Sequence, residues 1–377
     1  MRENREFRIL SAIGMLLVMF GHLGYNLLEV GELFPYYSFQ VFIFLFVAGY
    51  FYKPESEEQI GTYLVGKVCT LLIPYFIWNL AYGLIATLLH QFGFSIGEAI
   101  SLKTLFLSPF MDGHQFLYHY PAWFVPVLFL IETINVCMRR VLKQLRLDND
   151  WLIMGGLLLC GVLTVWLAIG GHVWGYYKIP GRILFMLPGF QMGRIYKEKL
   201  EKHDTLPSSV YLAIVMGVQI MITIVCAGLA FSAVWVSSFA NGPLVPYLTV
   251  ITGIAFWLRI SKVVAKLPGI AEHMILLGRN TFSLMMHHTM GFMLVKMVFY
   301  FISIATPFCS EFDVPMFFSE INFIYLAGGS EASKWIYVIA GISFSLLMAG
   351  LQHKITDTLF PTRRYRTLTH NHMHNHM

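Results

Sequence analysis

The sequence contains few charged residues. Asp, Glu, Lys and Arg make up only 12% of its 377 residues, about half the share found in soluble globular proteins. Hydrophobic residues make up 57%, and a soluble domain of this size has too little interior to bury so much apolar surface. A disordered chain has the opposite composition, with low hydrophobicity and high charge. The composition therefore excludes both classes and predicts a polytopic helical membrane protein.

Several motifs that are typical of metal-binding or nucleotide-binding proteins are also missing. None of the five cysteines forms a CxxC pair, which argues against a disulfide framework or a zinc site. There is no GxGxxG, P-loop or HExxH motif, and no internal repeat. We expect no metal ion. In the last segment, His370, His372, His374 and His376 are either ligands for a soft metal or part of a disordered tail, and we favour the tail.

Apolar stretches long enough to span a bilayer recur from end to end. They predict an all-α integral membrane domain over residues 1–352, followed by a basic, His-rich tail over residues 353–377. The ten predicted helices lie at roughly 9–28, 36–52, 65–90, 121–138, 151–169, 179–196, 209–230, 243–259, 280–303 and 333–351.

The basic residues predict the orientation. If the N-terminus is cytoplasmic and the segments alternate, 21 of the 26 Lys and Arg residues fall on the cytoplasmic side. This bias follows the positive-inside rule and places both termini in the cytoplasm. The connections at 91–120, 170–178 and 304–332, expected on the outer side, are longer than closure requires. Such loops are either functional or plain solvated connections.

Ionisable residues inside spanning helices are costly, so each one is a candidate for function. His22 falls in the first predicted helix, Glu132 in the fourth, and His287 and His288 are neighbours in the ninth. Adjacent residues on a helix point about 100° apart, so at most one of the two histidines faces any given cavity. Lys296 is also in the ninth segment, where snorkelling to the outer interface explains it.

His22 is the most informative of these residues. A neutral imidazole accepts and returns a proton near neutral pH, which favours a general base; an interhelical hydrogen bond is the alternative. Arg8 lies fourteen residues earlier, about 40° short of four full turns, so both residues share a face about 21 Å apart. This spacing suits a long anionic cofactor that enters from the cytoplasm, while ordinary positive-inside bias is the alternative for Arg8.

Five segments resemble, in order, motifs of the acyltransferase-3 integral membrane proteins, and the closest likeness is to the fucose 4-O-acetylase-like branch. The first ends in Gly-His, the second in an Ala-Gly-Tyr-Phe turn, and the third contains Leu-Ile-Pro-Tyr. The fourth carries Trp-Phe, and the fifth carries Gly-x-Asn-Thr followed by histidine. The segments are SAIGMLLVMFGH, FPYYSFQVFIFLFVAGYFY, KVCTLLIPYFIWN, AWFVPVLFLIE and LGRNTFSLMMHH.

The resemblance implies about ten helices around a central cavity. It also implies transfer of an acetyl or other short acyl group from cytoplasmic acetyl-CoA to a hydroxyl of an extracytoplasmic carbohydrate. His22 matches the essential histidine of the first helix, and His287 matches the late histidine. Many members place an arginine eleven residues before the first histidine, where this chain has Ser11. Arg8 is the nearest counterpart, and Arg182 or Lys67 are alternative sources of the charge.

These observations give a set of expected site residues. We predict that His22, His287 and Glu132 act in catalysis, with His22 as the general base. Arg8, Lys67, Arg182 and Asn280 are expected to bind acetyl-CoA, and Trp123 and Tyr75 the carbohydrate. Direct transfer and a relayed acyl intermediate both remain open.

A membrane transporter for a small, amino-acid-like solute is the alternative function, because intramembrane His, Glu and Arg residues also form substrate sites and proton relays. For either function the expected location is a cell membrane, with a bacterial inner membrane favoured.

Overall fold

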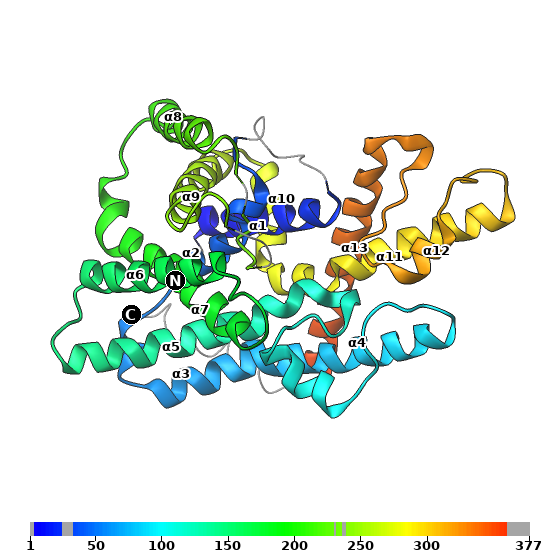
Figure 1. Ribbon diagram of the computed structural model, residues 1–377, viewed down its shortest axis with the longest axis horizontal. Helices are drawn as coiled ribbons and strands as arrows, with labels where there is room; N and C mark the ends of the chain where they lie inside the picture. Colours follow the sequence, from blue (N-terminus) through cyan, green and yellow to red (C-terminus); the bar gives the residue numbers. More distant parts are fainter. Residues whose placement is uncertain (1–3, 25–32, 230, 236–238, 360–377) are drawn as a thin grey trace, which may run out of the picture.

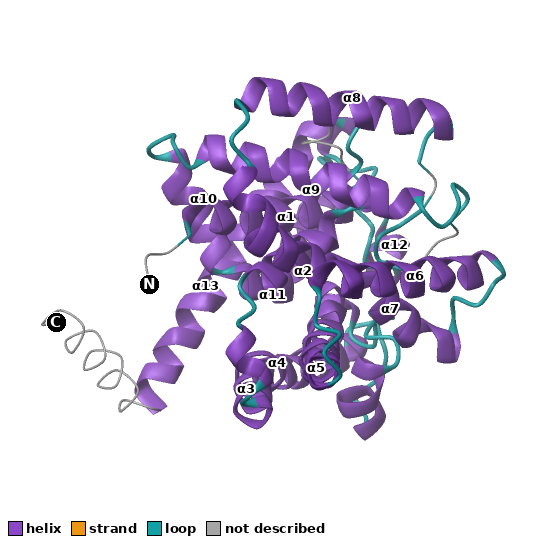
Figure 2. Cartoon of the chain, turned by 90° about the vertical axis from the view of Figure 1, so that its left-hand side faces the viewer, coloured by secondary structure: helices purple, strands orange, loops and turns teal. Residues whose placement is uncertain are grey.

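The computed structural model describes residues 4–24, 33–229, 231–235 and 239–359, with side chains as far as residue 354. The His-rich end of the chain lies outside these residues. Figure 2 shows helices and connecting segments, and no strand in the part of the chain that is described. The α-helices are α1 Arg5–His22, α2 Gln40–Tyr50, α3 Ile60–Lys67, α4 Ile73–Gln91, α5 Phe124–Gln144, α6 Asp150–Ile169, α7 Lys178–Ile195, α8 Ser208–Cys226, α9 Val245–Val264, α10 Ile270–Arg279, α11 Thr281–Ala305, α12 Val314–Ser319 and α13 Lys334–Leu359.

Each of the ten predicted segments contains a helix. Seven helices among the described residues are long and apolar enough to cross a membrane. Helix α2 has 11 residues and is therefore only about 16 Å long, roughly half the hydrocarbon thickness of a bilayer. Helix α1 ends at His22, so this histidine is the last residue of its helix and not an interior one. Leu23 and Gly24 form a turn after the helix, and the rest of the predicted continuation, 25–28, lies outside the described residues.

Helices α3 and α4 form one long spanning segment, Ile60–Gln91, interrupted by a π-helical stretch over Val68–Leu72. Pro74 follows this stretch in the first turn of α4. Proline lacks the N–H for the helical hydrogen bond, and its ring crowds the carbonyl four residues earlier. Wider π-type turns accommodate such a break, which explains the π-helical stretch just before Pro74.

Helix α1 lies inside the bundle. It packs against α2, α9 and α10, while α2 packs on α7 and α11 packs on α13. The segment α3–α4 runs alongside α5 (Figure 1). Close approach of α2 to α7 depends on Gly49 and Gly193, because a Cβ on either would collide with a backbone carbonyl oxygen of the facing helix. In contrast, α8 is almost entirely on the outside of the bundle.

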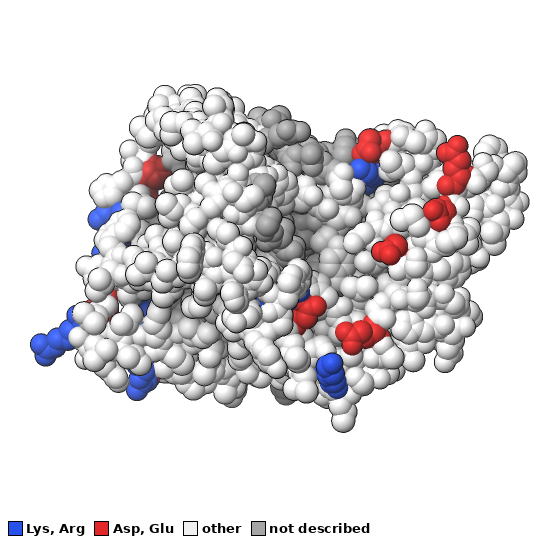
Figure 3. All heavy atoms as spheres, viewed as in Figure 1, with Lys and Arg blue, Asp and Glu red and all other residues white. Residues whose placement is uncertain are grey.

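The two ends of the bundle differ in charge. On the face shown in Figure 3, most Lys and Arg lie at the end where the chain begins, and most Asp and Glu lie at the opposite end. We call the first the basic end, with Lys53 and Lys199 exposed there, and the second the acidic end, with Glu98 and Glu320 exposed there. That the basic end is cytoplasmic stays a prediction from the positive-inside rule.

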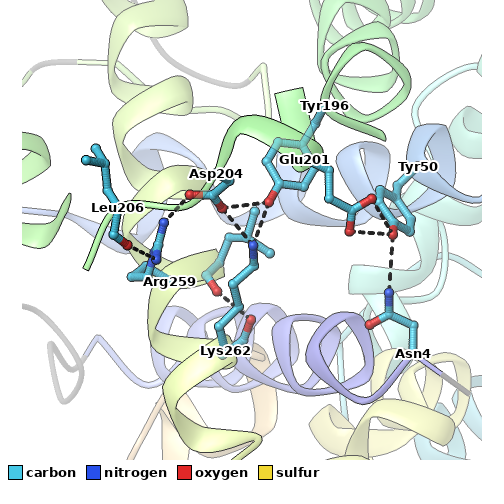
Figure 4. Close-up of polar contacts among 10 residues, drawn as sticks. Asn4, Tyr50, Tyr196, Glu201, Asp204, Leu206, Arg259 and Lys262 are labelled. Atoms are coloured by element: carbon cyan, nitrogen blue, oxygen red, sulfur yellow. Dashed lines mark hydrogen bonds and ion pairs between the residues drawn. The ribbon is translucent and has the colours of Figure 1, made fainter. Parts of the chain in front are cut away.

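A polar cluster fastens the connection between α7 and α8 at the basic end (Figure 4). Asp204 accepts hydrogen bonds from Tyr196 Oη at 2.8 Å and Lys262 Nζ at 2.7 Å, and it pairs with Arg259. Arg259 also donates to the Leu206 carbonyl at 2.8 Å. Burial raises the pKa of Asp204, but the hydrogen bonds from Lys262 and Tyr196 and the nearby positive charges outweigh burial and hold the pKa below its usual value.

Replacement of Asp204 by Asn is expected to destabilise the protein, because it leaves Arg259 and Lys262 without their shared counter-charge. Breaking such a buried pair costs about 3 kcal/mol. Thermal unfolding in detergent should show a midpoint several degrees lower for this variant. Glu198→Gln, on an exposed residue of the same connection, serves as the control, and equal midpoints for the two variants would contradict this role of Asp204.

Candidate functional site

Three cavities follow one another along α1. The basic-end cavity has a volume of about 440 Å3 and contains Arg8 and Lys67 in its wall. The central cavity, of about 230 Å3, is bounded by Met15, Val18 and His22, and the acidic-end cavity, of about 520 Å3, begins at His22. Neighbouring cavities share walls. Phe44 lines the first two, and Gly21 and His22 line the last two.

A single face of α1 connects these spaces. Arg8, Ser11, Met15, Val18 and His22 line the cavities in that order, and their spacing of three, four, three and four residues defines one side of an α-helix. The helical periodicity therefore correctly predicts that Arg8 and His22 share a face. Ser11, at the position where the resemblance implies an arginine, lines the same cavity as Arg8.

The basic-end cavity contains three of the predicted site residues. Lys67 Nζ lies 2.6 Å from Glu132 Oε1, and Glu132 Oε2 has no hydrogen-bond partner. Arg8 donates to the Gly278 carbonyl at 3.4 Å, and α10 approaches α1 closely there because Gly278 has no side chain to strike the Arg8 backbone. The cavity thus combines cationic side chains with one buried carboxylate.

His22 is held between two rings at the wall shared by the central and acidic-end cavities. Its Nδ1 is hydrogen-bonded to Tyr120 Oη, whose ring meets the imidazole edge-on with centroids 4.6 Å apart. On its other side the His288 ring stacks at 5.4 Å. His288 is fully buried and donates from Nδ1 to the Leu284 carbonyl at 2.6 Å. The second ring nitrogen of His22, Nε2, has no protein partner among the described residues.

The two long connections at the acidic end supply the groups around His22. Tyr120 comes from the first, and it donates to Asn322 Oδ1, from the second, at 3.1 Å. Lys296 on α11 is only 1% exposed and donates to the Ile321 carbonyl at 2.8 Å, directly beside Asn322. The expected snorkelling of Lys296 is therefore wrong, because its ammonium group points into the protein and anchors a loop.

Trp123 lines the central cavity, and Arg182 stacks on its ring with the guanidinium carbon 4.0 Å from the ring centroid. Arg182 donates to the Asp112 carbonyl at 2.8 Å. The Asp112 side chain pairs with Lys178, and it accepts a hydrogen bond from His114 at 3.1 Å. The His114 contact and the Lys178 charge hold the pKa of Asp112 far below its usual range, although burial opposes them.

Three other predicted residues lie outside the cavities. Tyr75 on α4 and His287 on α11 are buried, and Gln115, from the connection before α5, donates to the Tyr75 hydroxyl at 3.3 Å. The Tyr82 hydroxyl lies 2.7 Å from His287 Nδ1. Asn280 marks the corner between α10 and α11 and donates to the Leu276 carbonyl at 2.8 Å. The structure thus brings His288, and not His287, to His22.

Sequence reasoning missed Tyr120 and Asn322. Tyr120 is one of 19 tyrosines, and no local pattern distinguishes it. The two connections that contain these residues are unusually long, and their length indicated that the loops could be functional. It did not indicate which residue in each loop. Among the described residues, no group of three or more His, Cys, Asp or Glu is arranged to hold a metal ion.

Comparison with known proteins identifies the family. A family model described as an acyltransferase domain matches residues 4–351, nearly the whole chain, and the protein therefore belongs to this acyltransferase family. It is the acyltransferase-3 family that the five segments resemble. No curated protein and no solved structure matches the chain. The family and the apolar helices together indicate a multi-pass membrane acyltransferase.

The Lys67–Glu132 pair predicts a non-additive response to mutation. Lys67→Met alone should cost about 3 kcal/mol, because it leaves the Glu132 carboxylate buried without its cation. The double variant Lys67→Met with Glu132→Gln should be more stable than Lys67→Met. Thermal unfolding of the wild type, both single variants and the double variant measures this coupling, and a double variant less stable than Lys67→Met would contradict it.

Proposed function

We propose that this membrane acyltransferase moves an acetyl group from acetyl-CoA, bound at the basic end, to a hydroxyl of a carbohydrate at the acidic end. The observation that carries the proposal is the row of three cavities along α1, with His22 at the last shared wall. In the orientation that the basic residues favour, the donor enters from the cytoplasm and the acceptor from the other side of the membrane.

The basic-end cavity suits the phosphates of the donor. Arg8 and Lys67 line it, and charge-assisted hydrogen bonds from arginine and lysine are strong contacts for phosphate. Glu132 lies 2.6 Å from Lys67, in a cavity that His22 does not line. We therefore assign Glu132 to orient that lysine. The thin pantetheine arm then extends past Met15 and Val18, whose apolar side chains line the central cavity.

The acidic-end cavity suits a hydroxylated acceptor. Tyr120, Asn322 and Lys334 line it beside His22, and such groups donate and accept hydrogen bonds to sugar hydroxyls. Trp123 forms part of the central cavity wall, where it shields the thioester from water. Arg182 supports the Trp123 ring from behind, so we assign it to this wall and not to the CoA phosphates.

The position of His22 favours direct transfer. One nitrogen of His22 removes the proton from the acceptor hydroxyl as the oxygen attacks the thioester carbonyl. The tetrahedral intermediate collapses, the C–S bond breaks, and the CoA thiolate takes the proton back from His22. The products are the O-acetyl ester and free CoA. Tyr36, whose ring packs on Gly21 and lines the central cavity, is our candidate for stabilising the oxyanion.

His22→Ala should reduce acetyl transfer by about 10²- to 10⁴-fold, the usual contribution of a general base. The measurement is release of CoA from acetyl-CoA by purified protein with surface-glycan extract, and membrane levels should stay normal. His172→Ala, at the exposed end of α6, is the control. Full activity of His22→Ala would contradict the mechanism. Solute uptake by vesicles without CoA release would favour transport instead.

Removal of charge from the basic-end cavity should weaken donor binding and leave the chemical step intact. The Lys67→Met and Glu132→Gln double variant keeps the cavity free of an unpaired carboxylate, and it should raise the KM for acetyl-CoA about tenfold with little change in kcat. Lys103→Met, an exposed lysine at the acidic end, is the control. An unchanged KM in the double variant would place the phosphates elsewhere.

A further inference from the structure

Tyr120 and Asn322 form a chain of two hydrogen bonds that ends at His22. The Tyr120 hydroxyl is hydrogen-bonded to His22 Nδ1, and the same hydroxyl donates to Asn322 Oδ1 at 3.1 Å. A phenol has one proton to donate, and its oxygen accepts other hydrogen bonds. Since that proton goes to Asn322, the Tyr120 oxygen is the acceptor toward His22, and Nδ1 of His22 is the donor.

We propose that Tyr120 and Asn322 are positioning residues that hold His22 as the tautomer protonated on Nδ1, so that Nε2 is the atom that removes the acceptor proton. The inference rests on the proposed acyl transfer. It adds an assignment that the family match does not make, namely which nitrogen acts and what fixes it. The arrangement has the logic of a catalytic triad in which a neutral tyrosine and amide replace the carboxylate.

The surroundings of His22 restrict rotation of its ring. The imidazole lies between the Tyr120 ring, which meets it at 71°, and the His288 ring, which is stacked on it at 21°. His288 Nδ1 donates to the Leu284 carbonyl, and its Nε2 has no hydrogen-bond partner among the described residues. His288 therefore stacks on His22 without forming a hydrogen bond to it. Since His22 lines both the central and acidic-end cavities, its Nε2, which has no partner among the described residues, is left for substrate.

The two positioning residues are themselves fixed to α11. Lys296 donates to the Ile321 carbonyl at 2.8 Å, next to Asn322. Thr289 donates to the Tyr118 carbonyl, two residues before Tyr120. Both anchors are buried, at 1% exposed for Lys296 and 3% for Thr289. One helix therefore sets the positions of two loops whose side chains meet at the histidine.

The test compares two replacements of Asn322. Aspartate keeps an oxygen that accepts from Tyr120, and leucine removes it at similar volume. Ring 15N chemical shifts of full-length protein in lipid bilayers, with the His22 signals assigned by comparison with His22→Asn, report the tautomer directly. We expect the Nδ1–H form in the wild type and in Asn322→Asp, and a shift toward Nε2–H in Asn322→Leu and Tyr120→Phe.

Kinetics supply the second readout. Asn322→Leu and Tyr120→Phe should lower kcat by about 10- to 100-fold, as expected for loss of one hydrogen bond that acts in the transition state, with the KM for acetyl-CoA unchanged. Asn322→Asp should keep most of the activity. Tyr118→Phe is the matched control, because the buried Tyr118 hydroxyl has no hydrogen-bond partner in the described part of the chain and its removal should leave kcat unchanged.

The outcomes separate the inference from the function on which it rests. An Nε2–H tautomer in the wild type, or equal losses of kcat in Asn322→Asp and Asn322→Leu, would overturn the assignment of Nε2 as the base. Full activity of His22→Ala would overturn the acyl-transfer mechanism itself, whatever the 15N spectra show.

Discussion

A polar side chain inside an apolar bundle needs a partner, and this requirement organises the structure around α1. His22 at one end of the helix is bonded to Tyr120, and Lys67 near the other end is paired with Glu132. The first contact brings a loop to α1, and the second joins α3 to α5 beside the cavity that Arg8 of α1 also lines. The spaces that remain between these contacts are the three cavities, so the groups that need partners also form the walls of the path.

The separation of charge along the path gives each end a distinct chemistry. Cationic residues line the basic-end cavity, apolar residues line most of the central one, and neutral polar groups join Lys334 in the acidic-end cavity. The basic-end cavity favours phosphates. The central cavity keeps water from a thioester carbonyl, and the acidic-end cavity offers hydrogen-bonding groups to the hydroxyls of a sugar. His22 is a residue common to the last two, which is why a single histidine suffices for direct transfer in our account.

Much of the fold follows from sequence because lipid imposes strict rules. Apolar length was enough to predict the helical segments, and helical periodicity was enough to predict the shared face of Arg8 and His22. The count of clear spanning helices was not predictable to the same degree. Helix α2 is too short to cross a bilayer. Helix α1 differs from an ordinary apolar span because its own first turns contain charged residues. The end of α1 at His22 also escaped prediction, since the apolar run continues beyond it.

The sequence predicted part of the site, and the rest depends on how the helices and loops pack. Arg8, Lys67, Glu132, His22 and Trp123 were expected and line the cavities, whereas His287 and Tyr75 are buried outside them. Adjacent His287 and His288 are indistinguishable by period, and the choice between them depends on how α11 is rotated against α1. Tyr120 and Asn322 meet through contacts between loops 202 residues apart in the chain, and no local pattern encodes that meeting.

Transfer across the membrane at His22 is the central claim, and sidedness tests it most directly. Protein would be reconstituted in one orientation, with radiolabelled acetyl-CoA confined to the side of the basic end and carbohydrate acceptor confined to the other. The account predicts labelled carbohydrate on the acceptor side and free CoA retained on the donor side. Labelled product that forms only when acetyl-CoA and acceptor are supplied together on the acidic-end side would contradict it.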